Sequence, residues 1–276
     1  MTFSPDRLAE LDAFLLDLNR ASAAVILPLF RADHGLIDKG GPKTAEGGGF
    51  DPVTEADKGA ERAIRALIAA RYPDHGVIGE EYGEDRPDAE FVWVLDPVDG
   101  TRAFISGLPL WTTLISLRWQ GTPTLSSIGQ PYLGEIFLGH AGGSRLIDRT
   151  GVRPLKVRAC PLLTDAVIHT TDPNQYFDGA ELGAWNQVRA AAKLARTGCD
   201  AYGYAMVALG VMDLAIEGRV CKAWDIEVAQ PLIEGAGGVA TNWRGDPIGR
   251  NGGQLVVAGD RECLEEALVA LRRSAK

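Results

Sequence analysis

Cysteine and histidine are scarce in this sequence, which has four of each among its 276 residues. The cysteines stand far apart (Cys160, Cys199, Cys221 and Cys263), which disfavours a zinc knot or a redox pair and fits a reducing compartment. The histidines form no ligand-spaced pair such as His-Glu-x-x-His. We therefore expect a cytoplasmic protein in which any metal is held by oxygen ligands.

Long hydrophobic runs are also absent. The longest run near the N-terminus, residues 23–30, contains Pro28 and is far too short to span a bilayer. The first twelve residues carry acids and lack a basic segment followed by an apolar core, so no signal peptide is expected. These observations predict a chain without a membrane segment.

Basic residues are outnumbered by acidic ones. The sequence has 28 Lys and Arg against 37 Asp and Glu, a formal net charge of −9. This balance disfavours general nucleic-acid binding, because phosphate backbones need basic partners. With 46% hydrophobic and 24% charged residues, the composition is typical of a globular protein with a substantial core.

Helix and strand patterns alternate along the first half of the chain. Apolar residues at helical spacing predict a helix over 6–30, and an acidic capping box at Thr54–Asp57 begins a second helix that ends near Tyr72. Between them lies a glycine-rich loop, residues 31–50. Short apolar runs predict strands at 77–78, 91–95, 112–119, 123–128 and 135–140, and the last three favour an antiparallel sheet.

The pattern changes after about residue 150. Helices are expected over 183–194, 202–212, 225–235 and 261–273, and strands at 166–169, 213–216, 238–242 and 255–258. We place a boundary at Thr150-Gly151. Residues 1–150 form an N-terminal α+β part with an antiparallel sheet and most of the candidate metal ligands. Residues 151–276 form a C-terminal α/β part that completes the metal site and the substrate pocket.

The densest chemical signal is the segment Leu95-Asp96-Pro97-Val98-Asp99-Gly100-Thr101. An apolar strand ends there in two carboxylates, which cannot both be buried and ionised without a counter-charge. A hard divalent cation such as Mg²⁺ meets this need, because it prefers carboxylates, carbonyls and water and leaves positions for a phosphate. The Val98 carbonyl could add an oxygen, and the turn at Gly100 could offer N–H groups to an anion. By itself, the segment is equally compatible with an Asp-capped turn.

Two other segments carry acids. Val77-Ile78-Gly79-Glu80-Glu81 places acids after a predicted strand, and Ala223-Trp224-Asp225-Ile226 places one at the start of a predicted helix. Taken singly, each has a plain structural alternative. Residues 81–90 could form a solvated acidic loop, and Asp225 could be an ordinary helix cap.

Taken together, these segments resemble the inositol monophosphatase-like superfamily of Mg²⁺-dependent phosphatases. Four motifs match in order along nearly the whole chain: Asp51-Pro52-Val53-Thr54-Glu55-Ala56-Asp57, Ile78-Gly79-Glu80-Glu81, residues 96–101, and Trp224-Asp225 with the downstream Glu234-Gly235-Ala236-Gly237-Gly238. The resemblance implies a fold of mixed α+β and α/β character, a layered αβαβα sandwich of the inositol monophosphatase and fructose-bisphosphatase type. It also implies a homodimer.

The resemblance assigns a role to individual positions. The positions that match the family's Mg²⁺ ligands are Glu80, Asp96, the Val98 carbonyl, Asp99 and Asp225, with two or three ions expected and Mn²⁺ as a possible substitute. Asp57 and Thr101 match a pair that orients the attacking water, so Asp57, Glu80 and Thr101 are the candidate catalytic residues. Gly100 and Thr101 would donate N–H groups to the phosphate, and Asp99 and Asp225 would also contact the substrate. Lys43 is the nearest candidate for a family lysine that precedes the first motif.

Residues 102–111 and 198–202 bear on which ester is the substrate. Arg102-Ala103 stands where inositol monophosphatases typically have Thr-Asn, and both segments resemble histidinol-phosphate phosphatases of this superfamily. Asp200, with Glu217, would pair with the ammonium and imidazole groups of that substrate. The alternatives are a helix cap for Asp200 and a surface turn for Glu217. Arg102 could contact the phosphate or pair with an acid of a neighbouring subunit.

The leading hypothesis is a phosphatase that converts L-histidinol phosphate to L-histidinol and phosphate in histidine biosynthesis. One alternative is the same chemistry on inositol monophosphate, a sugar bisphosphate or 3′-phosphoadenosine 5′-phosphate. Another is a binding or regulatory protein that keeps the fold without catalysis. The net charge does not oppose a small phosphate ester, because cations collected by the site acids would make a local anion trap.

Overall fold

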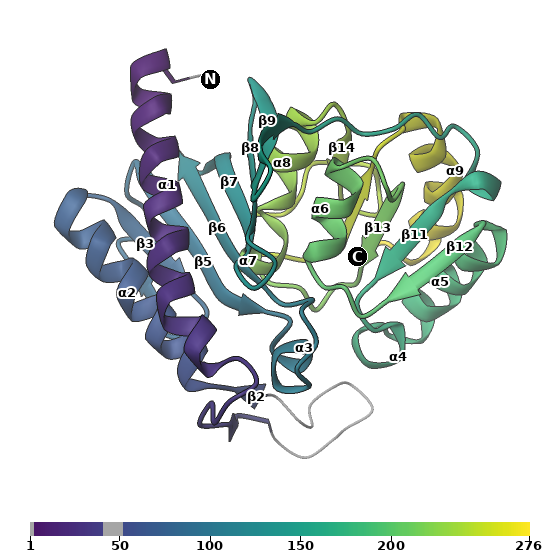
Figure 1. Ribbon diagram of the computed structural model, residues 1–276. Coiled ribbons are helices and arrows are strands. Elements are labelled where there is room, and N and C mark those ends of the chain that lie inside the picture. The colour runs from purple at the N-terminus through teal and green to yellow at the C-terminus, as the bar shows by residue number, and fades with distance from the viewer. Residues whose placement is uncertain (1–2, 41–51) are drawn as a thin grey trace.

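Two large β-sheets alternate with three layers of helices, and β1 (Ile37–Asp38) and β2 (Pro52–Val53) form a separate two-stranded pair (Figure 1). The structure is a computed structural model that describes residues 3–40 and 52–276. The first layer holds α1 (Pro5–Ile26) and α2 (Glu55–Arg71), the middle layer α6 (Tyr202–Ala208) and α8 (Ala229–Gly235), and the last layer α5 (Gly179–Ala191) and α9 (Arg261–Leu271). The predicted αβαβα sandwich is confirmed.

The first sheet has eight strands in the order β10-β9-β8-β7-β6-β5-β3-β4. All neighbours are antiparallel except β3 and β5, which run parallel and so end at the same edge. The strands are β3 (Gly76–Gly79), β4 (Gly83–Asp85), β5 (Phe91–Asp99), β6 (Thr112–Trp119), β7 (Thr122–Gln130), β8 (Glu135–His140), β9 (Gly143–Asp148) and β10 (Gly151–Pro154). Of these, β4, β9 and β10 were not predicted.

The second sheet has five strands in the order β12-β11-β13-β15-β14. Because β12, β11 and β13 are parallel, their carboxyl ends share one edge. The strands are β11 (Val167–Thr170), β12 (Leu194–Thr197), β13 (Leu214–Glu217), β14 (Val239–Thr241) and β15 (Leu255–Ala258). The other short elements are α3 (Thr101–Ile105), α4 (Pro173–Tyr176) and α7 (Ala223–Ile226), with 3₁₀ turns at Leu27–Leu29, Leu163–Asp165 and Arg272–Ser274.

The hydrophobic core follows the alternation of side chains along the strands. Ile115 and Leu117 of β6 join a cluster with α1 and α2, whereas Leu114 points to the opposite face and joins a cluster with α6 and α8. This is the two-residue period of a strand buried on both faces. A further cluster packs α5 and α9 against the second sheet. Within residues 3–40 and 52–276, no helix is both long and apolar enough to cross a membrane.

Several sequence predictions differ from the structure. β12 was not predicted, and the helix expected over 202–212 ends at Ala208. The boundary at Thr150-Gly151 falls inside the hairpin of β9 and β10, so the chain leaves the first sheet only after Pro154. The helix expected over 225–235 is divided into α7 and α8. This break places Pro231 in the first turn of α8, where its missing N–H removes no helical hydrogen bond.

Candidate active site

The carboxyl end of β5 is irregular, and the irregularity brings several polar groups of this segment together. The pairing of β5 with β6 shifts register between Asp96 and Asp99, and the Val98 N–H donates to Asp96 Oδ1 at 3.1 Å. Gly100 then adopts a φ of +80°, which favours glycine, and α3 begins at Thr101. Both carboxylates and the intervening carbonyl therefore leave the strand within a few residues.

Asp57 and Thr101 lie together, although they are far apart in the sequence. Asp57 Oδ2 accepts the Thr54 N–H at 2.7 Å and the Thr54 hydroxyl at 2.5 Å, which completes the predicted capping box of α2. The Thr101 hydroxyl lies 3.4 Å from Asp57 Oδ1 and 3.0 Å from the Val98 carbonyl oxygen. The cap therefore fixes one carboxylate oxygen and leaves the other for Thr101.

Glu80 and Asp225 reach the same end of β5 from two sides. Glu80 directly follows β3, and its N–H donates to the Leu95 carbonyl of β5 at 3.3 Å. Asp225 lies on α7, which packs against β5. Its Oδ2 accepts the Lys222 N–H at 2.7 Å, and Lys222 rather than Asp225 is the N-cap residue.

The carboxylates of this cluster all have raised pKa values, because they are desolvated and lie near one another. Burial raises the pKa of Asp57 to about 6 and that of Asp225 to about 7. Burial and then the charge of Asp225 raise the pKa of Glu80, and burial and then Glu80 and Asp99 raise that of Asp96. Burial and Asp200 likewise raise the pKa of Asp99. The acids cannot all ionise unless a cation offsets their charge.

The donor set suits a hard divalent cation. It consists of carboxylates and one carbonyl, without sulfur or imidazole, which is the oxygen set that Mg²⁺ prefers. Within residues 3–40 and 52–276, no three His, Cys, Asp or Glu side chains already form a compact metal cluster. The acids are linked here by their electrostatic effect on one another rather than by a preformed ligand geometry.

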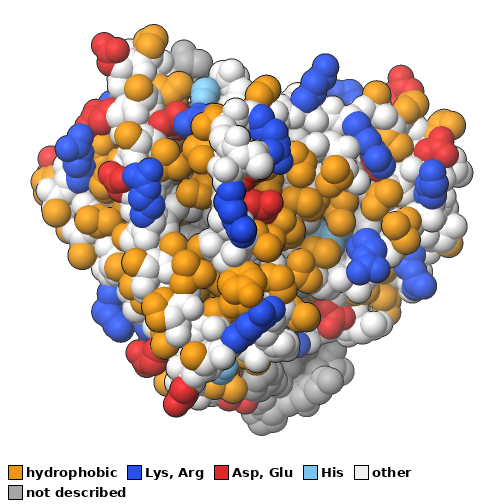
Figure 2. All heavy atoms as spheres, viewed as in Figure 1, with side chains coloured by type: hydrophobic (Ala, Val, Ile, Leu, Met, Phe, Trp, Pro, Cys, Tyr) orange, Lys and Arg blue, Asp and Glu red, His pale blue; other side chains and the backbone are white. Residues whose placement is uncertain are grey.

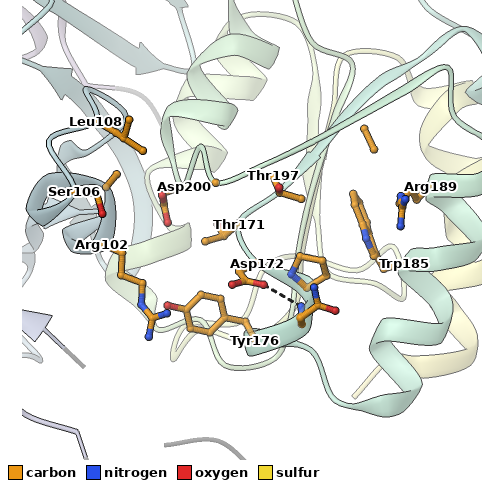
Figure 3. Close-up of a pocket in the computed structure, with 15 residues that line it drawn as sticks. Arg102, Ser106, Leu108, Thr171, Asp172, Tyr176, Trp185, Arg189, Thr197 and Asp200 are labelled. Atoms are coloured by element: carbon orange, nitrogen blue, oxygen red, sulfur yellow. Dashed lines mark hydrogen bonds between the residues drawn. The ribbon is translucent and has the colours of Figure 1, made fainter. Parts of the chain in front are cut away.

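A cavity of about 590 Å³ adjoins this cluster between α3 and α4 (Figure 3). Asp200 lies at one side, and Tyr176 and Asp172 line the wall formed by the α4 segment. Asp172 caps α4 by accepting the Asn174 N–H at 3.1 Å. Arg102 of α3 donates to the Gln175 side chain and lies over the Tyr176 ring, at 5.7 Å from the centroid. Arg102 thus links α3 to α4 beside the cavity.

Asp200 does not cap the helix that follows it. α6 starts at Tyr202 and has no side-chain cap, so the helix-cap alternative for Asp200 is wrong. The residue has a φ of +47°, an uncommon backbone conformation for a residue with a side chain. Its carboxylate lies beside Gly100, where a Cβ added to the glycine would be 3.1 Å from Asp200 Oδ2. Burial raises its pKa to about 6, and the charge of Arg102 acts in the opposite direction.

Glu217 is the last residue of β13 and is only 2% exposed, so the surface-turn alternative is wrong. Its Oε1 accepts the Thr171 N–H at 2.9 Å and the Thr171 hydroxyl at 3.0 Å, and its Oε2 lies 3.4 Å from the Thr170 hydroxyl. Burial raises its pKa well above the ordinary range. The carboxylate therefore ties the ends of β11 and β13 together. Its predicted contact with substrate stays a prediction.

Sequence reasoning missed an ion pair beside Glu80. The Glu81 side chain is only 3% exposed and pairs with Lys39 Nζ at 2.9 Å, so Glu81 does not belong to a solvated loop. Pairing of Asp38 with Pro52 holds Lys39 near the start of α2. A strand pair of two residues leaves no periodic signal in a sequence. Lys43 and Asp51 lie outside the described residues, as does the second half of the glycine-rich loop 31–50.

Comparison with known proteins gives the family. The Inositol monophosphatase family matches residues 7–276, and the chain belongs to it. The bifunctional phosphatase IMPL2, chloroplastic, of Arabidopsis thaliana is 37% identical over 276 residues, which cover 96% of this chain and 75% of that protein. A histidinol-phosphatase of Chlorobaculum parvum is 34% identical over 209 residues, which cover 76% of this chain and 79% of the relative.

A solved structure supports the same assignment. The inositol monophosphatase of Zymomonas mobilis superposes with a TM-score of 0.81 at 33% identity, over 94% of this chain and 96% of that one. The predicted family and fold are thus confirmed, and the family is one of hydrolases that are generally Mg²⁺-dependent. Since the relatives carry different substrate names, the family alone does not fix the ester.

Proposed function

We propose that this protein is a Mg²⁺-dependent phosphatase that converts L-histidinol phosphate to L-histidinol and phosphate, in histidine biosynthesis. The observation that carries the proposal is the position of Asp200. Its carboxylate lies beside Gly100 at one side of the cavity, and it caps no helix. A partly buried carboxylate at a cavity wall is a natural partner for a substrate cation.

The proposed metal ligands are Glu80, Asp96, the Val98 carbonyl, Asp99 and Asp225. Two or three Mg²⁺ ions would bind there, with Mn²⁺ as a possible substitute. When bound, the metal would supply positive charge to the phosphate and to the attacking water. The raised pKa values of these carboxylates support the proposal, because a cation is what would allow them to ionise together.

Asp57 and Thr101 would orient the attacking water. The Thr101 hydroxyl has one hydrogen and two acceptors within reach, Asp57 Oδ1 and the Val98 carbonyl. Donation to Asp57 leaves the carbonyl free for its proposed ligand role and leaves the Thr101 oxygen to accept a hydrogen from water. Since burial raises the pKa of Asp57 only to about 6, this carboxylate is mostly ionised at neutral pH and can accept.

Gly100 and Thr101 would place the phosphate. Their N–H groups stand at the start of α3, where backbone donors have no partner within the helix. In L-histidinol phosphate the ammonium-bearing carbon is bonded to the carbon of the ester, so the cation lies close to the phosphate. Asp200 would therefore receive the ammonium. The imidazole would extend into the cavity toward Tyr176, and Glu217 is a second proposed partner for the polar groups of the substrate.

One observation favours a second ester, inositol monophosphate. The solved structure at 33% identity is an inositol monophosphatase. The cavity of about 590 Å³ also has room for a polyol. A sugar bisphosphate and 3′-phosphoadenosine 5′-phosphate belong in the same comparison, as does a member of the fold that binds without catalysing.

A panel of these phosphate esters tests the proposal. Phosphate release is measured for each ester with Mg²⁺ and with EDTA, and kcat/KM is compared. We expect the highest value for L-histidinol phosphate and no release in EDTA. Preference for inositol monophosphate would overturn the substrate. Absence of turnover with every ester would overturn the proposed hydrolysis and favour a binding role.

We also propose a homodimer, as the resemblance implies. Figure 2 shows hydrophobic side chains gathered across the middle of the face that Figure 1 presents. Exposed large hydrophobic residues of the described chain include Leu108, Tyr132, Leu162 and Val211. Sedimentation of the purified protein would give the assembly, and a monomer at micromolar concentration would contradict the dimer. The cytoplasmic location stays a prediction.

A further inference from the structure

Glu61 is a fully buried carboxylate close to the site, and none of the roles assigned so far uses it. It lies on α2 one helical turn after Asp57 and is 0% exposed. Its Oε2 accepts the Glu81 N–H at 2.8 Å. Its Oε1 accepts the Tyr82 N–H at 3.2 Å and Arg65 Nε at 2.7 Å. A buried charge held by three donors has a defined geometry.

The end of β3 lies very close to the Glu61 carboxylate. A Cβ on Gly79 would be 2.1 Å from Glu61 Oε1, so only glycine lets the end of β3 approach so closely. Arg65 extends the contact, because its guanidinium also donates to the Gly83 carbonyl. Glu61 and Arg65 together therefore hold the turn from Gly79 to Gly83.

Glu80 stands in the middle of that turn. Its own N–H is bound to β5 through the Leu95 carbonyl, and the next N–H, that of Glu81, is bound to Glu61. The peptide groups on both sides of Glu80 are thus fixed by different elements. With its backbone fixed, the direction in which the Glu80 side chain leaves the chain is fixed as well.

We propose that Glu61 is a positioning residue for Glu80: it fixes the backbone of the Gly79–Tyr82 turn so that the Glu80 carboxylate meets the other site acids, and it thereby raises the affinity of the site for its divalent cation. This inference rests on the proposed ligand role of Glu80. Glu61 contacts backbone N–H groups and Arg65, and it acts on the site only through Glu80.

Glu61→Gln removes this geometry with little change in volume. A carboxylate offers two oxygens that both accept, whereas an amide offers one oxygen and an NH₂ group that only donates. In Glu61→Gln the NH₂ group must face the Glu81 N–H on one side, or the Tyr82 N–H and Arg65 on the other. At least one of the three bonds is lost, and the turn that carries Glu80 loosens.

Asp213 provides a matched control. Its carboxylate is 1% exposed and accepts the Val167 N–H and Arg158 Nε, both at 2.7 Å. It thus has the same kinds of partner as Glu61. Asp213 precedes β13, whereas Glu217 ends that strand, so Asp213 lies at the opposite edge of the sheet from the site. Asp213→Asn should lower stability in a similar way without reaching the metal site.

The experiment measures Mn²⁺ binding by calorimetry to the full chain, stripped with chelator, and thermal unfolding of the same samples. We expect Glu61→Gln to weaken Mn²⁺ binding by about 10- to 100-fold, the range seen when partners of metal ligands are removed. Asp213→Asn should stay within about twofold of wild type even if it unfolds at a similar temperature. Glu61→Asp, which keeps the charge but shortens the side chain, should fall between wild type and Glu61→Gln.

Glu80→Gln distinguishes failure of the positioning role of Glu61 from failure of the ligand role of Glu80. If Glu80→Gln weakens Mn²⁺ binding and Glu61→Gln and Glu61→Asp leave it unchanged, Glu61 is not a positioning residue, and the proposed metal site stands. Equal losses in Glu61→Gln and Asp213→Asn would also overturn the inference, because they would reflect stability alone. If Glu80→Gln itself binds Mn²⁺ like wild type, the proposed ligand role of Glu80 fails. If Glu61→Gln does not fold, Glu61→Asp decides by the same criteria.

Discussion

The two sheets meet at the site, and their acidic residues have different surroundings. In the eight-stranded sheet, Asp96 and Asp99 leave a bulge at the end of β5, and their pKa values rise through burial and through neighbouring acids. In the five-stranded sheet, Glu217 ends β13 and is bound by the backbone and hydroxyl groups of Thr171. Both groups of acids have raised pKa values, but the first group gathers at the proposed metal site, whereas Glu217 is tied to the end of β11 by its hydrogen bonds.

This difference suggests a division of labour between the halves of the chain. The N-terminal half supplies most proposed metal ligands and the pair that would orient water. The C-terminal half supplies Asp225 and the loop that carries Asp200, beside the cavity. The halves meet at the centre, where Asp99 Oδ2 accepts the Ala201 N–H at 2.8 Å and Arg102 of α3 donates to Gln175 of α4. Changes to the metal ligands and the water-orienting pair should therefore affect turnover, and a change at Asp200 should affect the choice of ester.

The largest effect is expected from Asp99→Asn, which removes a central charge from the first half. Asparagine can still accept the Thr112 hydroxyl and the Ala201 N–H, so the fold should survive. We expect kcat/KM for phosphate release to fall at least about 10³-fold, since about 4 kcal/mol of charge stabilisation is lost. Circular dichroism checks the fold. Turnover close to wild type would contradict the ligand assignment.

A smaller loss of turnover is expected from Thr101→Val. Valine has nearly the shape of threonine but lacks the hydroxyl that lies between Asp57 and Val98. We expect kcat to fall about 10²-fold with little change in KM, as for loss of a group that acts on a proton in the transition state. Thr101→Ser is the control and should retain most activity. Equal activity in the two variants would remove the water-orienting role.

Asp200→Asn tests the C-terminal half. We expect KM for L-histidinol phosphate to rise about tenfold, while KM for inositol monophosphate, a neutral polyol ester, stays nearly unchanged, because one charged contact is worth about 1.4 kcal/mol here. Asp172→Asn is the matched control: it lines the same cavity and keeps an oxygen for the α4 cap. Equal losses for both esters would show that Asp200 does not choose between them.

The smallest expected effect is on stability, measured as the melting temperature with and without Mg²⁺ at two pH values. Burial raises the pKa of Asp57 to about 6 and that of Asp225 to about 7, above their values in an unfolded chain. The folded, metal-free protein therefore binds these protons more tightly, and stability falls as pH rises from about 4 through about 7. Mg²⁺ should raise the melting temperature by several degrees more at pH 8 than at pH 5. A larger shift at pH 5 would contradict this sign.

Local features of the fold and site could be predicted from the sequence. The capping box Thr54–Asp57 has the predicted bonds, and the apolar run that ends in Asp96 and Asp99 is the end of β5. Caps and strand periodicity depend on residues close in the chain, so they remain visible in a sequence. The order of four motifs also identified the family, which the match to residues 7–276 confirms.

Only the tertiary structure decided which side chain meets which. Lys39 lies against Glu81 because a two-residue strand pair holds it there, and Glu61 binds the turn after β3 from a different element. The sequence left Asp200 and Glu217 between a structural and a functional alternative. In the structure Asp200 does not cap a helix, and Glu217 does not lie in a surface turn. These outcomes depend on contacts between distant segments, and burial and hydrogen bonding arise from such contacts rather than from local pattern.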